Sequence, residues 1–220
     1  MVGAKPRICV SIVDADLSAV EKVEPLVDFF EVRIDLIGLG WWDVAEHLKK
    51  PWIACNRRLE EGGKWRGSEP GRIKELLSAL ELGASIIDIE LGVPDLGNIV
   101  KEIKGKAECL VSYHNTRVTP SMKELKVILK REMDAGADIC KAVTTARTFA
   151  DNSPVLQLIK DFPQVKIVAF AMGEAGQISR VLCPLVGGYF TYASIEAGKE
   201  SAAGQVTADE LRKIYGMIKA

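Results

Sequence analysis

One lysine in this chain of 220 residues is placed where covalent chemistry is favourable. Lys141 lies in the run Asp-Ile-Cys-Lys-Ala-Val, with apolar residues on both sides. Burial disfavours the ammonium form of a lysine, and the neutral amine that results can attack a carbonyl group. The alternative is a lysine that reaches solvent from a strand edge or is paired with a carboxylate.

A histidine provides a candidate for proton transfer. His114 follows the apolar run Leu-Val-Ser-Tyr, whereas the other histidine, His47, falls in a predicted helix. An imidazole titrates near neutral pH and can act as a general acid or base. A hydrogen-bonded structural histidine is the alternative.

Charged residues recur at every second position in the run Glu-Val-Arg-Ile-Asp. Glu31, Arg33 and Asp35 are two apart, so on a strand their side chains lie on one face. Charges that face an interior must be paired or must bind a polar ligand. The pattern predicts either a self-satisfied ion cluster or a ligand site.

Further polar residues follow later apolar runs. Arg57 and Glu61 come after Trp52–Cys55, and the Gly62–Gly63 pair allows a sharp loop there. Arg58 and Glu60 are expected to be solvated. Glu90 is expected to be a structural carboxylate that supports a neighbour such as Lys141 or Arg33. Arg180 follows the seventh expected strand. A loop of small residues before the last helix could close over a ligand, and an ordinary flexible connector is the alternative.

These residues need a scaffold that brings strand ends together. The expected strands are Ile8–Val13, Phe30–Leu36, Trp52–Cys55, Ile86–Glu90, Cys109–Tyr113, Ile139–Val143, Lys166–Phe170 and Gly188–Tyr192. Helical spacing fills the intervals at Leu17–Phe29, Ile73–Leu82, Met122–Ala135, Leu156–Phe162 and Ala208–Ile218. Strands that alternate with helices indicate parallel βαβ units. Eight units predict an α/β protein with a (β/α)8 TIM barrel, formed by residues 1–220 as a single domain; an open doubly wound sheet is the alternative.

Composition indicates which partners and which cellular location to expect. The formal net charge is −1, and the charges are spread along the chain, so neither nucleic acid nor a membrane is expected as a partner. No secretory signal pattern begins the chain, and the five cysteines form no CxxC pair. We therefore expect reduced thiols and a cytoplasmic location. The spacing of histidines and cysteines indicates no metal site, and no dinucleotide-binding turn occurs, so no cofactor is expected.

Taken together, these motifs resemble those of type I 3-dehydroquinate dehydratases. The resemblance rests on Glu31–Asp35, on Arg57 with Glu61-Gly-Gly, on Ser112-Tyr-His114, on Lys141, on Met172 through Arg180, and on Ser201–Gln205, in that order. It implies a TIM barrel, usually a homodimer, that dehydrates 3-dehydroquinate to 3-dehydroshikimate by syn elimination. The reaction belongs to the shikimate pathway of aromatic amino acid biosynthesis.

The resemblance also implies a role for each site residue. Lys141 would form a Schiff base with the C3 ketone, His114 would act as general acid and base, and Glu61 would orient His114. The remaining expected contacts are Arg180, Ser201 and Gln205 to the carboxylate, Glu31, Arg33 and Arg57 to the ring hydroxyls, and Ser11, Met172 and Tyr192 in the pocket wall.

The departures from the family pattern include the start of the chain and one residue of the expected pocket. The chain starts almost directly at the first strand, so an N-terminal hairpin carried by many bacterial members is expected to be absent. Tyr192 stands where a pocket phenylalanine is common. Two other functions remain open: a class I aldolase, which also uses a barrel lysine, and a barrel-fold binding protein without catalysis.

Overall fold

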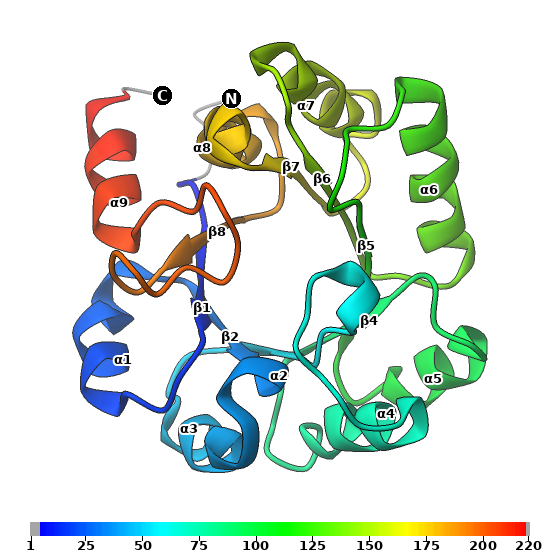
Figure 1. Cartoon of the computed structure of the whole chain (residues 1–220), viewed down its shortest axis with the longest axis vertical. Coiled ribbons are helices and arrows are strands. Elements are labelled where there is room, and N and C mark those ends of the chain that lie inside the picture. Colours follow the sequence, from blue (N-terminus) through cyan, green and yellow to red (C-terminus); the bar gives the residue numbers. More distant parts are fainter. Residues whose placement is uncertain (1–4, 219–220) are drawn as a thin grey trace.

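Eight parallel strands form the centre of the molecule and the helices surround them (Figure 1). The computed structural model describes residues 5–218. The strands are β1 (Ile8–Ile12), β2 (Phe29–Arg33), β3 (Trp52–Cys55), β4 (Ile86–Glu90), β5 (Glu108–His114), β6 (Ile139–Thr145), β7 (Ile167–Met172) and β8 (Thr191–Ser194). They follow the order β7-β6-β5-β4-β3-β2-β1-β8, so the sheet curls into a nearly closed barrel. The predicted TIM barrel is confirmed.

The join between β7 and β8 is looser than the others. Within residues 5–218 no ladder links these two strands. The segment that leads into β8 instead donates one hydrogen bond across the join, from Tyr189 N to Ile167 O at 2.7 Å.

Helices cover the outside of the barrel. They are α1 (Leu17–Val23), α2 (Ile34–Ile37), α3 (Trp41–His47), α4 (Glu69–Ser78), α5 (Leu96–Ile103), α6 (Met122–Asp134), α7 (Asn152–Asp161), α8 (Gln177–Leu182) and α9 (Ala208–Met217). The starts of α6 and α9 are marked in the sequence, where Ser121 and Thr207 form capping boxes with Glu124 and Glu210. Within residues 5–218, no helix has both the length and the apolar character needed to cross a membrane.

The strands are buried on both faces, as their unbroken apolar runs indicated. Every residue of β1, β3, β4 and β8 is buried. On β4, Ile87 and Ile89 belong to the core cluster that packs with helix residues such as Leu76 and Val100. Asp88 and Glu90 alternate with these isoleucines along the strand, so their side chains lie on the other face and enter the barrel.

Two predicted strand ends were wrong by three residues, and the other ends differ by two residues or fewer. The second strand ends at Arg33, and Ile34–Ile37 form the short helix α2, so Asp35 lies on a helix and not beside Glu31 on a strand. The last strand begins at Thr191 rather than at Gly188. Among residues 5–218, β1 is the first helix or strand.

Candidate active site

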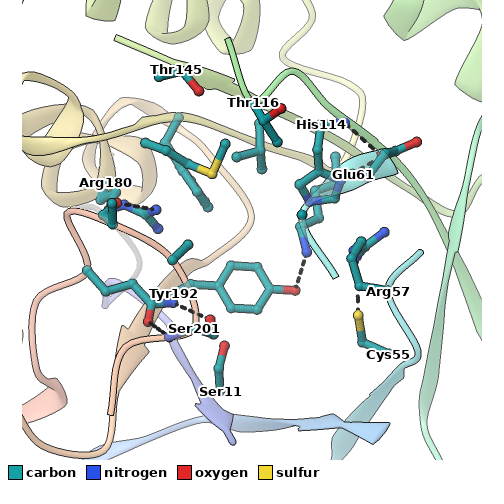
Figure 2. A pocket seen from close by; sticks show the side chains of 18 of the residues that line it. Ser11, Cys55, Arg57, Glu61, His114, Thr116, Thr145, Arg180, Tyr192 and Ser201 are labelled. Atoms are coloured by element: carbon teal, nitrogen blue, oxygen red, sulfur yellow. Dashed lines mark hydrogen bonds and ion pairs between the residues drawn. The ribbon is translucent and has the colours of Figure 1, made fainter. Parts of the chain in front are cut away.

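A cavity of about 330 Å³ opens at the C-terminal ends of the strands. This is the end at which β/α barrels place their catalytic residues, and the volume suits one small molecule. All twelve predicted site residues line it: Ser11, Glu31, Arg33, Arg57, Glu61, His114, Lys141, Met172, Arg180, Tyr192, Ser201 and Gln205. Sequence reasoning missed the other lining residues, which are Cys55, Gly62, Thr116, Val143, Thr145, Phe170, Gly173, Ala202 and Ala203. Figure 2 shows the side chains converging on this space.

Lys141 enters the cavity from β6 and is 4% exposed. Its Nζ donates to Asp88 Oδ2 at 2.9 Å and to the Tyr192 hydroxyl at 3.0 Å. Glu31 Oε1 lies at 3.5 Å. The lysine is therefore both paired with a carboxylate and exposed to the pocket, which combines the two alternatives left open by the sequence.

Asp88 is the principal residue that the sequence analysis missed. Besides Lys141, it accepts a hydrogen bond from Arg57 Nη2 at 2.6 Å and one from the Ser112 hydroxyl at 2.6 Å. Burial alone raises the pKa of Asp88, but the charges of Arg57 and Lys141 outweigh burial and hold that pKa well below its usual range. The signal was its spacing, since Asp88 lies two residues before Glu90 on the interior face of β4, where a carboxylate must be paired.

Glu90 has partners other than the predicted ones. Its carboxylate lies 3.1 Å from Arg57 Nη1 and 2.8 Å from Arg72 Nη2, not beside Lys141 or Arg33. Glu90 and Asp88 thus hold Arg57 from two sides. The correction has a simple cause: Arg72 lies on α4, and only the folded chain brings it to the end of β4.

His114 and Glu61 form a directly bonded pair. His114 Nδ1 lies 2.9 Å from Glu61 Oε2, and the His114 backbone N–H donates to the same oxygen at 2.9 Å (Figure 2). Burial, and then the charges of Arg57 and Lys141, hold the pKa of His114 well below its usual value, so the resting imidazole is neutral. This differs from the expectation of titration near neutral pH. Burial raises the pKa of Glu61 to about 7, against the opposing charge of Arg57.

A tight loop places Glu61 over His114. Gly63 N donates to Arg58 O at 2.9 Å, and a Cβ at Gly63 would lie 1.8 Å from Arg57 O. Only glycine fits this close approach. Arg58 and Glu60 pair with each other near solvent, as expected.

The three charges predicted to share one face divide into two groups. Glu31 faces the cavity and accepts a hydrogen bond from the Ser11 hydroxyl at 2.7 Å. Arg33 pairs with Asp35 at 2.7 Å. Asp35 also accepts from the backbone N–H of Lys64 at 2.9 Å, so it fixes the loop that carries Glu61. The cluster is therefore partly self-satisfied and partly open to a ligand.

Arg180 is a buried cation without a counterion. It is 1% exposed, and no carboxylate among residues 5–218 pairs with it. Its Nη2 donates to Ala203 O at 3.2 Å, and its guanidinium lies 4.5 Å from the Phe170 ring centroid. Burial lowers the pKa of Arg180 to about 10, which leaves it charged at neutral pH. Such a group favours an anionic ligand.

The loop before α9 closes one side of the cavity beside Arg180. Ser201 N donates to Gln205 Oε1 at 2.8 Å, and Gln205 Nε2 donates to the Ser201 hydroxyl at 2.9 Å. Gly204 has φ of +78°, and a Cβ there would lie 2.4 Å from Gly173 O. A glycine is therefore required where this loop crosses the end of β7.

One group of side chains has donor atoms close enough for a metal ion. Glu31, Cys55 and Asp88 place ligand atoms within 4.8 Å of one another. Arg57 and Lys141 already neutralise Asp88, and Arg57 Nη2 donates to Cys55 Sγ at 3.3 Å. Two fixed cations in contact with the set disfavour a bound metal ion.

In essentially every characterised TIM-barrel enzyme, the active site lies at the C-terminal ends of the strands. Here a buried amine, a histidine–carboxylate pair and an unpaired arginine open onto one small cavity. The fold and the pocket together define a β/α barrel of the enzyme type, with a site for a small molecule.

Comparison with known proteins gives the family. The model of the type I 3-dehydroquinase family matches residues 8–220. A 3-dehydroquinate dehydratase from Dehalococcoides mccartyi is 43% identical over 97% of this chain and 96% of its own length. This chain belongs to the type I 3-dehydroquinase family. It is a hydro-lyase of the shikimate pathway, and the alternatives of an aldolase and of a non-catalytic barrel are set aside.

Solved structures agree on the fold. The 3-dehydroquinate dehydratase from Geobacillus kaustophilus superimposes with a TM-score of 0.87 at 22% identity, covering 98% of this chain and 91% of its own. The type I enzyme from Clostridium difficile, solved with covalently modified comenic acid, superimposes with a TM-score of 0.86 at 21% identity over 97% and 92% of the two chains.

Proposed function

We propose that this enzyme dehydrates 3-dehydroquinate through a Schiff base on Lys141. The observation that carries the proposal is that the Lys141 amine and the His114–Glu61 pair open onto one cavity from adjacent strands. Ser112 on β5 is in register with Lys141 on β6, and His114 lies two residues further along β5 on the same face. His114 is thus one layer above the amine, where a substrate bonded to Nζ extends.

In the proposed first half of the reaction, Lys141 adds to the C3 ketone and water leaves. The resulting iminium withdraws electrons from C2 more strongly than the ketone does, so the C2 proton becomes acidic. His114, neutral in the resting enzyme, takes that proton, and the C–H electron pair moves to form an enamine.

In the second half, His114 returns the proton to the C1 hydroxyl. The enamine electrons expel this group as water, and hydrolysis of the conjugated iminium releases 3-dehydroshikimate and the lysine. One base on one face handles both protons, which gives syn elimination. Glu61 stabilises the imidazolium and fixes its orientation through Nδ1.

The rest of the pocket is assigned to substrate binding. We propose that Arg180, with Ser201 and Gln205, binds the carboxylate, since Arg180 has no carboxylate partner of its own among the described residues. Glu31, Arg33 and Arg57 offer acceptors and donors for the ring hydroxyls. Ser11, Met172 and Tyr192 complete the wall. This chemistry uses neither a metal nor an organic cofactor.

The test is covalent trapping. Borohydride added during turnover of 3-dehydroquinate should reduce the imine, and peptide mapping should find the mass of the ligand on Lys141. Lys141→Ala should lose both the adduct and turnover, whereas Lys166→Ala, at an exposed lysine outside the cavity, should retain both. An adduct on another lysine, or none, would rule out the proposed nucleophile.

We further propose that the chain is one catalytic domain, that it assembles as a homodimer and that it works in the cytoplasm. The first two rest on the family resemblance, and five free, buried cysteines support a reducing compartment. Light scattering of the purified protein tests the dimer, since a mass of 24.0 kDa would indicate a monomer.

A further inference from the structure

The Lys141 amine donates hydrogen bonds to two side chains, and the hydroxyl of Tyr192 is one of them, beside Asp88. Tyr192 enters from β8, is 3% exposed, and its ring packs edge-on against Phe170 and Phe190 at centroid distances of 6.1 and 5.3 Å. Lys141 Nζ lies 3.0 Å from its oxygen and 4.2 Å from its ring centroid (Figure 2). The packing of the ring holds the hydroxyl beside the nitrogen that is to react.

The phenol accepts a hydrogen bond but its own hydrogen is unused. Tyr192 accepts from Lys141, and its O–H donates to no acceptor within residues 5–218. Tyr192 lines the cavity. A phenol in this position can donate its proton to a ligand atom next to Nζ.

Imine formation creates such an atom. The ketone oxygen and Nζ become bonded to the same carbon in the carbinolamine, so the oxygen lies one bond angle away from the nitrogen. In the balanced reaction an ammonium and a ketone give an iminium and water. Both hydrogens of that water come from the nitrogen, so two protons must cross from nitrogen to oxygen.

We propose that Tyr192 carries one of these two protons: its phenol gives a proton to the ketone oxygen and takes one from the Lys141 nitrogen. His114 first takes one proton from the ammonium, which frees the nitrogen lone pair, and later returns it to the carbinolamine hydroxyl, which leaves as water. As the N–C bond forms, the carbonyl electron pair moves to oxygen, which accepts the phenol proton. The tyrosine oxygen then receives an N–H proton and is restored. Tyr192 is thus a catalytic residue in imine formation and, by the reverse path, in imine hydrolysis. The proposal rests on the Schiff-base mechanism above.

The neighbours of the amine are poorly suited to this task. Asp88 is held as a carboxylate by Arg57 and Lys141 and has no proton to give. Glu31 accepts from Ser11 and lies 3.5 Å from Nζ. Burial, followed by the charge of Glu31, raises the pKa of Tyr192 well above its usual value, so the phenol retains its proton until transfer. His114 enters from β5 and is left to handle the other proton.

The test is Tyr192→Phe, which removes only the hydroxyl, compared with Tyr189→Phe, a neighbouring tyrosine outside the cavity. Rapid mixing with 3-dehydroquinate and quenching with borohydride measures the rate at which the Lys141 adduct forms. We expect Tyr192→Phe to slow this rate by about 10²-fold, the usual contribution of a general acid. Because imine formation then limits turnover, the kinetic isotope effect of C2 deuteration on kcat should fall toward unity. Tyr189→Phe should match the unaltered protein.

Two further measurements separate a proton role from a structural one. A ring acid that lacks the ketone should bind Tyr192→Phe and the unaltered protein equally. Replacing Tyr192 by 3,5-difluorotyrosine, which keeps the shape and makes the phenol more acidic, should move the basic limb of the trapping rate to lower pH. A trapping rate in Tyr192→Phe within twofold of the unaltered protein, or an unmoved limb in the fluorinated protein, overturns the proposal. Absence of any Lys141 adduct in the unaltered protein instead refutes the Schiff base itself.

Discussion

Lys141 Nζ and Asp88 Oδ2 lie 2.9 Å apart in an ion pair that is almost completely buried. Asp88 also holds Arg57 and Ser112, so this one carboxylate fixes both the amine and the arginine beside it. A buried pair of this kind is held in position by the barrel, whereas removal of one member leaves an uncompensated buried charge.

Asp88→Asn should therefore be strongly destabilising. The substitution removes the buried carboxylate that compensates the charges of Arg57 and Lys141. We expect a loss of about 3–5 kcal/mol in the free energy of unfolding. Urea unfolding measures it. Asp209→Asn breaks an exposed pair with Lys213 and should change stability by less than about 1 kcal/mol. Equal effects in the two variants would contradict the structural role of Asp88.

His114→Ala should separate imine formation from elimination. The variant keeps Lys141 and Tyr192, so borohydride should still trap the substrate, although more slowly because His114 carries the other proton of imine formation, while turnover falls by about 10²-fold or more. His47→Ala, on the exposed side of α3, serves as the control and should be unchanged. Near-normal turnover in His114→Ala would assign the base to another group.

Glu61 should set the acid limb of activity. Its pKa is about 7 in the free enzyme, so as pH falls through this value the carboxylate is protonated and His114 loses its negative partner. We expect kcat/KM of the unaltered enzyme to fall on acidification below about pH 7. Glu61→Gln should lower kcat less than His114→Ala does and should abolish this limb, because the remaining imidazole has a pKa well below its usual value. A limb that persists in Glu61→Gln excludes this assignment.

Arg180 and Gln205 should contribute unequally to substrate binding. Arg180→Ala removes the buried positive charge and should raise KM most. Gln205→Ala removes hydrogen bonds to a charged ligand and should weaken binding by about 1–2 kcal/mol. Arg131→Ala, at an exposed arginine of α6, should leave KM unchanged.

The same assignment predicts ordering of the loop Ser201–Gln205 by ligand. Hydrogen exchange in this loop should slow when the substrate carboxylate is bound. Identical exchange with and without ligand, together with an unaltered KM in Gln205→Ala, would show a plain connector and a carboxylate bound elsewhere.

Glu132 predicts an unusual pH dependence of stability. This residue of α6 is fully buried, and neither carboxyl oxygen has a hydrogen-bond partner within residues 5–218. Burial raises the pKa of Glu132 well above its usual value, and the nearby Cys140 thiol does not offset this. In the folded protein the group is neutral, whereas in the unfolded chain it ionises above about pH 4.3.

The contribution of Glu132 to the free energy of unfolding is therefore complete at pH values below its unfolded pKa. As pH rises from the unfolded pKa toward the folded pKa, this contribution is lost by about 1.4 kcal/mol for each pH unit. Glutamine does not titrate, so the Glu132→Gln variant should lack this loss. In urea unfolding, the stability of the variant relative to the unaltered protein should improve from pH 5 to pH 8. The exposed Glu102→Gln should show no such trend. A flat difference for Glu132→Gln would mean that the carboxyl is solvated or paired.

The sequence predicted the barrel because each strand is an apolar β-branched run that barrel and helices bury on both sides. It failed at Ile34–Leu36, where a run too short to show periodicity becomes α2. It also overlooked α5 and α8, which are short. Residue type and spacing indicated seven of the twelve proposed pocket residues, and the family pattern added Ser11, Met172, Tyr192, Ser201 and Gln205. Asp88 was missed, because its role depends on contacts with Arg57 and Lys141, which lie 31 and 53 residues away in the sequence.

The isolated charge of Arg180 links ligand concentration to the survival of the fold. Within residues 5–218, only carbonyl and aromatic contacts compensate the desolvated guanidinium when the pocket is empty, so the ligand-free barrel unfolds more readily than the occupied one. Any carboxylate that binds the native state alone stabilises it by RT ln(1 + [L]/Kd), about 2.7 kcal/mol at one hundred times Kd. Melting temperature thus becomes a screening signal for carboxylate inhibitors. In a cell, depletion of the metabolite would expose the enzyme to faster proteolysis, so its abundance would follow flux into the pathway.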